Sequence, residues 1–281
     1  MLDISPVARR LRDLVEPLAA NVYFAPEAID GYRELGCNYF EGYFCSRSAC
    51  LGAAPWTVVA ATFAAFKPAV VERAVTSGWA KTDPGSILAV RLASATAAFE
   101  RLIGDPPPEL DRATELLEGS VDGADPSGRP IFSGLTMLPV PETPWGRFWR
   151  AADRVREHRG DGHVAAWAPL VDSCEITVMS ELAWGIPPRT YVFTRGYDEA
   201  DVDAAYERLE SRGLVGSGAL TSHGAELRSS IEDRTDESVR TVIDRLGEDA
   251  DELFGILEPL TASVLAGGGY PVDPSRLHAD S

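Results

Sequence analysis

The sequence predicts a mainly α-helical fold with one short β-hairpin in its second half. Three observations lead to this prediction. Apolar residues recur at helical spacing along most of the chain, proline and glycine separate these stretches, and Gly216-Ser217-Gly218 is a turn signal between two short apolar segments. Because 45% of the 281 residues are hydrophobic, the chain can fill a sizeable core in one large domain or two of ordinary size.

Several helix boundaries follow from proline, glycine and capping residues. Ser5-Pro6 is typical of a first helical turn, because proline has no N–H and none is needed there. Asp83-Pro84 begins another long helix, which is expected to end at Gly104. Residues 109–118 are expected to form a short helix.

The clearest local pattern lies in residues 199–233. Residues 199–212 form an amphipathic helix, 214–215 and 219–220 two short strands, and Thr221 is expected to cap the next helix. The order Leu-x-x-Arg-Gly-Leu-Val and Leu-Thr-x-x-Gly resembles the helix, wing and following helix of MarR-like winged-helix proteins. This resemblance implies a fold and leaves the function open.

Two similar stretches indicate either an internal duplication or an accidental likeness. Leu51-Gly52-x-x-Pro55-x-Thr57 parallels Trp184-Gly185-x-x-Pro188-x-Thr190. With a duplication, two winged-helix-like halves (α with a small two-stranded β-wing) would pack about a central cleft. The expected parts are a degenerate winged-helix-like half (1–104), a helical, Pro/Gly-rich connector (105–144), a winged-helix half (145–266) and a flexible tail (267–281).

The charge of the chain disfavours nucleic acid and anionic membrane surfaces as partners. It carries 43 acidic and 26 basic residues, a formal net charge of −17, which repels phosphate groups. The helix before the predicted wing begins Asp198-Glu199-Ala200-Asp201-Val202-Asp203, at the end that approaches DNA in winged-helix regulators. The wing turn has no arginine or lysine, so binding to DNA is not expected.

The remaining composition predicts a cytoplasmic protein. Residues 1–13 alternate apolar and charged side chains and contain no signal-peptide core, and the apolar run 56–66 is too short to span a bilayer. Four cysteines in a chain of this length do not form a disulfide framework. Both a monomer and a homodimer remain open.

The most polar cluster is Arg156-Glu157-His158-Arg159-Gly160-Asp161-Gly162-His163. A helix from Trp145 to His158 is expected to stop at Gly160, and Asp161 to cap a new helix that starts at Gly162. The candidate catalytic residues are His158, His163, Asp161 and Arg159.

Opposite helix ends would give the two histidines opposite roles. His163, at a helix start, is expected to have a lowered pKa and to act as a general base, and His158, at a helix end, to act as a general acid. Arg159 or Arg47 would stabilise a developing anion. The structural alternative is that the arginines and Asp161 only stabilise helix ends and that the histidines face solvent.

A second cluster is aromatic, between residues 23 and 66. It supplies the candidate ligand-binding residues Tyr23, Glu41, Tyr43, Arg47, Phe63 and Phe66. Dense aromatic residues are typical of a core, and they are also typical of an apolar pocket with a few polar groups. In the second case, we expect this cluster to line one side of the cleft and residues 156–163 the other.

Four motifs together resemble an actinobacterial helix-turn-helix-like family of degenerate MarR type, without an established general function. They are Tyr23-Phe24-Ala25-Pro26-Glu27, Gly42-Tyr43-Phe44-x-x-Arg47, Thr62-Phe63-x-x-Phe66 and the polar cluster 156–163. The resemblance spans residues 7–264 and implies a shared architecture and a shared polar site, but no particular reaction. Lys67 departs from the family, which often has histidine there.

No cofactor or metal is expected. The spacing of His158 and His163 does not match a helical zinc pair, and Cys45-x-x-x-x-Cys50 has no second pair. Motifs for nucleotide phosphates, dinucleotides and serine hydrolases are missing from the sequence.

The predicted function is therefore binding of a small molecule on a repurposed winged-helix scaffold. The favoured form is a cofactor-independent acid/base enzyme of specialised metabolism, such as a lyase, cyclase, isomerase or hydrolase. The alternative is a ligand-responsive MarR-like transcriptional regulator.

Overall fold

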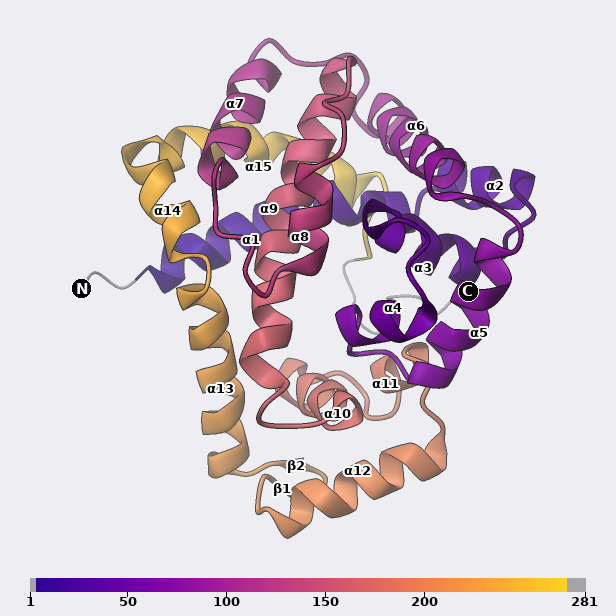
Figure 1. Ribbon diagram of the computed structural model, residues 1–281. Helices are drawn as coiled ribbons and strands as arrows, with labels where there is room; N and C mark the ends of the chain where they lie inside the picture. Colours follow the sequence, from indigo (N-terminus) through magenta and orange to yellow (C-terminus); the bar gives the residue numbers. More distant parts are fainter. Residues whose placement is uncertain (1–3, 272–281) are drawn as a thin grey trace.

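A computed structural model describes residues 4–271, most of which are helical (Figure 1). The α-helices are α1 (Ser5–Ala20), α2 (Pro26–Glu34), α3 (Tyr39–Ser48), α4 (Trp56–Thr62), α5 (Pro68–Trp79), α6 (Pro84–Leu102), α7 (Leu110–Val121), α8 (Pro130–Thr136), α9 (Pro144–Trp167), α10 (Ser173–Trp184), α11 (Tyr191–Thr194), α12 (Glu199–Ser211), α13 (Ser222–Glu237), α14 (Arg240–Leu246) and α15 (Ala250–Ala266). Short 3₁₀ helices are η1 (Asn21–Tyr23), η2 (Ala49–Leu51) and η3 (Gly247–Asp249), and the strands are β1 (Val215–Gly216) and β2 (Ala219–Leu220). The predicted mainly helical fold with one small hairpin is confirmed.

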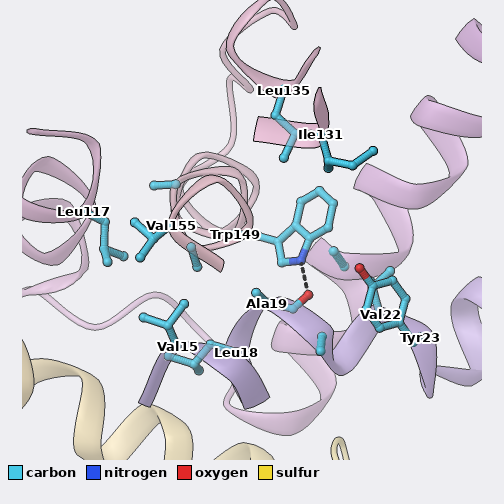
Figure 2. Close-up of a cluster of buried hydrophobic side chains, with 14 of the residues drawn as sticks. Val15, Leu18, Ala19, Val22, Tyr23, Leu117, Ile131, Leu135, Trp149 and Val155 are labelled. Carbon is cyan, nitrogen blue, oxygen red and sulfur yellow. Dashed lines mark hydrogen bonds between the residues drawn. The ribbon is translucent and has the colours of Figure 1, made fainter. Parts of the chain in front are cut away.

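Helix α9 is the element around which the other helices gather. It begins at Pro144, and the Thr143 side chain accepts a hydrogen bond from the Gly146 N–H at 3.2 Å. It packs against α1, α6, α7, α8 and α13 and crosses the middle of the molecule (Figure 1). On this helix the buried Trp149 donates from Nε1 to the Ala19 carbonyl at 3.0 Å, which joins α9 to α1 (Figure 2).

The buried apolar side chains form two clusters. The larger contains residues from α1 to α9 together with α14 and α15, and the smaller joins the end of α9 to α10, α12, the hairpin and α13. Helices α7 and α8, in the predicted connector, pack on α9 within the larger cluster. The two cores thus do not coincide with the predicted parts 1–104 and 145–266, and the division into duplicated halves stays a prediction.

The hairpin lies where the sequence predicts it. Val215 pairs with Leu220 in an antiparallel register, and the turn residues Ser217 (φ 53°) and Gly218 (φ 74°) both lie in the left-handed region that a two-residue hairpin requires. Thr221 then caps α13 by accepting from the Gly224 N–H at 3.1 Å. No other strand occurs in residues 4–271, so the first half has no hairpin of its own.

One local arrangement occurs twice. At the start of α3, Glu41 closes a capping box, and Lys81, which follows α5, binds its carboxylate at 2.6 Å. At the start of α10, Glu175 closes the same kind of box, and Arg208 of α12 binds it at 3.1 Å. In both places a buried glutamate holds a later helix in position. The duplication itself stays a prediction.

The predicted break in α9 is wrong, because the helix runs without interruption through Gly160 and Gly162. Neither glycine forms a turn, and Gly162 is required by close packing. A Cβ atom on Gly162 would overlap the Ser238 hydroxyl and lie 2.8 Å from Arg129 Nη1, so only glycine allows these groups to approach α9. A Cβ on Gly160 would meet only Glu157 Oε2, at 3.3 Å.

The end of the described chain also differs from the predicted flexible tail, 267–281. The Tyr270 ring packs edge-to-face against Phe24, with ring centroids 5.6 Å apart. Gly267 and Gly269 lie close to the side chain of Leu102. The packed segment therefore extends to Tyr270, and residues 272–281 lie outside the described part.

The two glycines of α9 make a matched test of this packing. Gly162→Ala should lower the free energy of unfolding by about 1–3 kcal/mol, because the added methyl group overlaps Ser238. Gly160→Ala should leave it unchanged or raise it by up to about 1 kcal/mol, since alanine is the better helix former. Urea unfolding of both variants measures the difference. Equal destabilisation by the two changes would contradict this account.

Candidate functional site

A cavity of about 620 Å³ lies beside α9. Residues from α1, α3, α10, α13 and the segment between α4 and α5 complete its wall. Its volume is typical of small-molecule sites, which measure about 300–1,000 Å³. Eight predicted site residues line it: Tyr23, Tyr43, Arg47, Phe63, Phe66, Arg159, Asp161 and His163. Among the described residues that form the wall, Glu41 and His158 do not appear.

The continuity of α9 decides which of its side chains reach the cavity. Successive residues of an α-helix are turned by about 100°, so residues three and four apart share a face. The stripe that faces the cavity is Arg156, Gly160, His163 and Trp167. Asp161 also lines the cavity, turned about 100° from Gly160 around the helix axis, whereas His158 is turned about 160° from Gly160 and does not line it.

His158 therefore cannot take the predicted role of a general acid in this cavity. It lies inside α9 and not at a helix end, and its ring packs edge-to-face against Phe132 with centroids 4.9 Å apart. Burial, with a smaller effect of the nearby Arg129, lowers its pKa to about 3. The imidazole is thus neutral and belongs to the core.

The wall of the cavity contains a buried ion pair. Arg47 Nη2 of α3 lies 2.9 and 3.1 Å from the two oxygens of Glu157, and Arg156 Nη1 donates to Oε1 at 2.6 Å. Burial alone would raise the pKa of Glu157, but Arg47 and Arg156 lower it to about 2. Arg156 also binds Glu16 of α1 at 2.9 Å. These contacts tie α1 and α3 to α9.

Tyr23 lies at the centre of this group of charges. Its hydroxyl accepts from Arg91 at 3.1 Å and from Arg156 at 3.4 Å, and the guanidinium carbon of Arg47 lies 5.4 Å from its ring centroid. Burial raises its pKa to about 12, against the effect of the arginines. The phenol thus keeps its proton and positions the arginines.

Arg159 does not have the free charge that the predicted anion-binding role requires. Its Nη2 donates to Asp236 of α13 at 2.8 Å and approaches Glu232 at 3.4 Å. Arg9 binds the same Asp236 at 2.7 Å. The charge of Arg159 is therefore balanced by carboxylates within the protein.

Asp161 is a buried carboxyl group in the cavity wall, with 5% of its surface exposed. Its Oδ2 accepts from the Phe132 N–H at 2.9 Å. Asp161 therefore caps the start of α8 and not a new helix at Gly162. No arginine or lysine of residues 4–271 forms an ion pair with it, and burial raises its pKa to about 7. Near neutral pH the group can hold or release a proton.

His163 is a second titratable group in the same wall. Its Nδ1 lies 3.0 Å from the Thr235 hydroxyl, which donates its own proton to the Ile231 carbonyl at 2.8 Å. Since that hydroxyl has one proton, Nδ1 must be the donor, and Nε2 keeps the lone pair. Burial lowers the pKa of His163 to about 4. The predicted lowering is found, but its cause is burial and not a helix start.

Glu41 has a structural place away from the cavity. Its carboxylate closes the capping box of α3, accepts from Ser77 Oγ at 2.5 Å and binds Lys81. These contacts use its oxygens completely. The predicted ligand-binding role of Glu41 therefore has no support in the structure.

Sequence reasoning assigned no catalytic or ligand-binding role to several charged residues of the wall, among them Glu157 and Arg195. Glu157 lies four residues before Asp161 on the continuous helix, and its negative charge adds to the effect of burial in raising the pKa of Asp161. Arg195 and Tyr191 also lie four residues apart and both line the cavity, but Tyr191 begins and Arg195 follows a helix of only four residues, Tyr191–Thr194. So short a helix has no periodicity that could reveal a shared face.

Comparison with known proteins gives one informative result. A sequence model described as a helix-turn-helix family matches residues 8–271. No curated protein and no solved structure matches the chain. Within residues 4–271, no helix has the length and apolar character needed to cross a membrane, and no three His, Cys, Asp or Glu side chains form a candidate metal site.

The raised pKa of Asp161 predicts a pH-dependent effect on stability. Between about pH 4 and pH 7 the unfolded aspartate ionises while the folded one keeps its proton, so this group destabilises the folded parent as pH rises. Asp161→Asn removes that effect. The free energy of unfolding of the variant minus that of the parent should increase from about pH 5 to pH 8. Urea unfolding at both pH values tests this, and a constant difference would contradict it.

Proposed function

We propose that this chain, which belongs to this helix-turn-helix family, binds a small organic molecule in the cavity beside α9 and performs acid/base chemistry on it. The observation that carries the proposal is that two titratable groups of α9, Asp161 and His163, both line this cavity. Asp161 is buried and His163 is half-buried, and their pKa values, about 7 and about 4, differ in the sense that an acid and a base require.

In the proposed mechanism His163 removes a proton from the ligand through Nε2, while Thr235 holds the opposite nitrogen. Protonated Asp161 donates a proton to the group that gains negative charge. This division suits lyase, cyclase, isomerase or hydrolase reactions, and we propose a substrate of specialised metabolism. The scaffold would be a MarR-type winged helix in which ligand binding has replaced DNA binding.

A ligand-responsive regulator is the second candidate, because the family is a helix-turn-helix family and a hairpin follows α12. The start of α12 argues against it. Lys67 binds Asp198 at 3.0 Å and Asp201 at 2.5 Å, and Arg189 binds Asp203 at 2.5 Å. These carboxylates are held by cations of the same chain and present no donors to a phosphate backbone.

A probe reaction tests the acid/base pair without knowledge of the substrate. In 5-nitrobenzisoxazole, removal of the C3 proton breaks the N–O bond and forms a nitrile and a phenolate. His163 would take the proton and Asp161 would protonate the phenolate oxygen. We expect turnover between about pH 4 and pH 7, where His163 is neutral and Asp161 is protonated.

The histidine variants are a matched pair for this test. His163→Gln should lower the rate by about 10²-fold. His158→Gln, on the other face of α9, should leave it within about threefold, because a group that does not touch the ligand takes no part in proton transfer. Equal rates in parent and His163→Gln, with melting temperatures unchanged, would overturn the catalytic proposal.

Gel retardation at low salt with DNA from upstream of the coding sequence separates the two candidates. We expect no specific retardation by the parent, because the start of α12 is acidic and neutralised internally. Specific retardation that a single base change abolishes would establish the regulator instead.

A further inference from the structure

Arg195 has an environment unlike that of any other arginine in the cavity wall. Arg195 comes directly after α11 in the chain, and 5% of its surface is exposed. Its guanidinium carbon lies 4.3 Å from the ring centroid of Tyr191 and 4.7 Å from that of Phe66. Within residues 4–271 no carboxylate forms an ion pair with it, and its buried Nε has no hydrogen-bond partner.

The other arginines of the wall all have carboxylate partners. The ion pairs are Arg12 with Asp13 at 2.7 Å, Arg47 with Glu157 at 2.9 Å, Arg156 with Glu16 at 2.9 Å, Arg159 with Asp236 at 2.8 Å, and Arg228 with Glu232 at 2.6 Å. The cavity thus has one cationic group whose charge the described protein leaves unbalanced.

A buried cation without a partner is unfavourable, because water no longer solvates it and no anion replaces the water. The aromatic rings compensate part of this cost through cation–π attraction. The rings offer no hydrogen-bond acceptor to the N–H groups of the guanidinium. These donors form a planar fork, which matches the two oxygens of a carboxylate.

A route of aromatic contacts leads from Arg195 toward α9. Phe66 contacts Tyr43, with ring centroids 5.7 Å apart. The Tyr43 hydroxyl in turn accepts from Arg47 at 2.8 Å, and Arg47 binds Glu157 on α9. An apolar, planar molecule that is anchored at Arg195 would lie along these rings in the direction of α9.

We propose that Arg195 binds the carboxylate of an aromatic or similarly planar carboxylic acid, and that this acid is the ligand of the cavity. The inference rests on the proposed small-molecule function and names its substrate class. A monoanion is favoured over a phosphate ester, because a second negative charge would need a second free cation. The other cationic side chains of the described wall are paired, and His163 is neutral.

Matched probes test this assignment by calorimetric titration of the full chain. 2-Naphthoate and 2-naphthamide have the same ring system and differ in charge. The parent should bind the naphthoate at least about 10-fold more tightly, since a charge-assisted pair is worth about 10- to 100-fold in affinity. Arg195→Gln should remove this preference, and Arg195→Lys should retain part of it.

Arg189→Gln is the control, because Arg189 also lies over a tyrosine ring, that of Tyr206, but outside the cavity. This variant should bind both probes like the parent. Gly160→Leu, which fills the cavity with a helix-compatible side chain, should weaken both probes.

The outcomes distinguish the inference from the proposed function. Binding of both probes that Gly160→Leu abolishes but Arg195→Gln leaves unchanged would retain the small-molecule site and overturn the role of Arg195. Tighter binding of 2-naphthyl phosphate than of 2-naphthoate would overturn the choice of a carboxylate. Failure of both probes to bind the parent would overturn both proposals.

Discussion

The carboxylate of Glu157 holds together helices that are distant in the sequence. It accepts from Arg47 of α3 and from Arg156, which itself binds Glu16 of α1. A buried ion pair of this kind adds little net stability compared with an apolar core, but the loss of one partner costs about 3–5 kcal/mol. The interaction therefore fixes where α1, α3 and α9 lie. The wall of the cavity is built on those three helices.

This arrangement of charges explains why a cavity exists inside so well packed a molecule. Guanidinium groups that are already bound to carboxylates cannot collapse onto apolar side chains without losing those bonds. The space between them is bordered by Tyr23, Phe63 and Phe66, which supply apolar surface. Most charges around this space cancel one another. Asp161 and Arg195 are the exceptions in the described wall, because neither forms an ion pair with a described residue.

In this chain the start of α12, the helix before the hairpin, is bound by residues of the protein itself. In a DNA-binding relative of the helix-turn-helix architecture, the helix before the wing presents donors to phosphates. In this chain, Lys67 binds the carboxylates at the start of α12, and the Lys67 N–H donates to the Arg195 carbonyl at 2.9 Å. The same contact places Arg195 beside Phe66 in the cavity. The start of α12 is therefore joined to the segment that carries Arg195 in the cavity wall.

The sequence by itself determined the helical class, the hairpin at residues 215–220 and the cap at Thr221, because periodicity and turn chemistry are local properties. It also singled out eight residues that line the cavity. It could not decide whether Gly160 and Gly162 end a helix, since a glycine in a turn and a glycine under a close contact look alike in a sequence. That contact, between Gly162 and Ser238, exists only after folding. Because α9 is continuous, His158 lies in the core, and Asp161 and His163 line the cavity. The balance of buried charge was decided by the tertiary structure alone, because it depends on distances between remote residues.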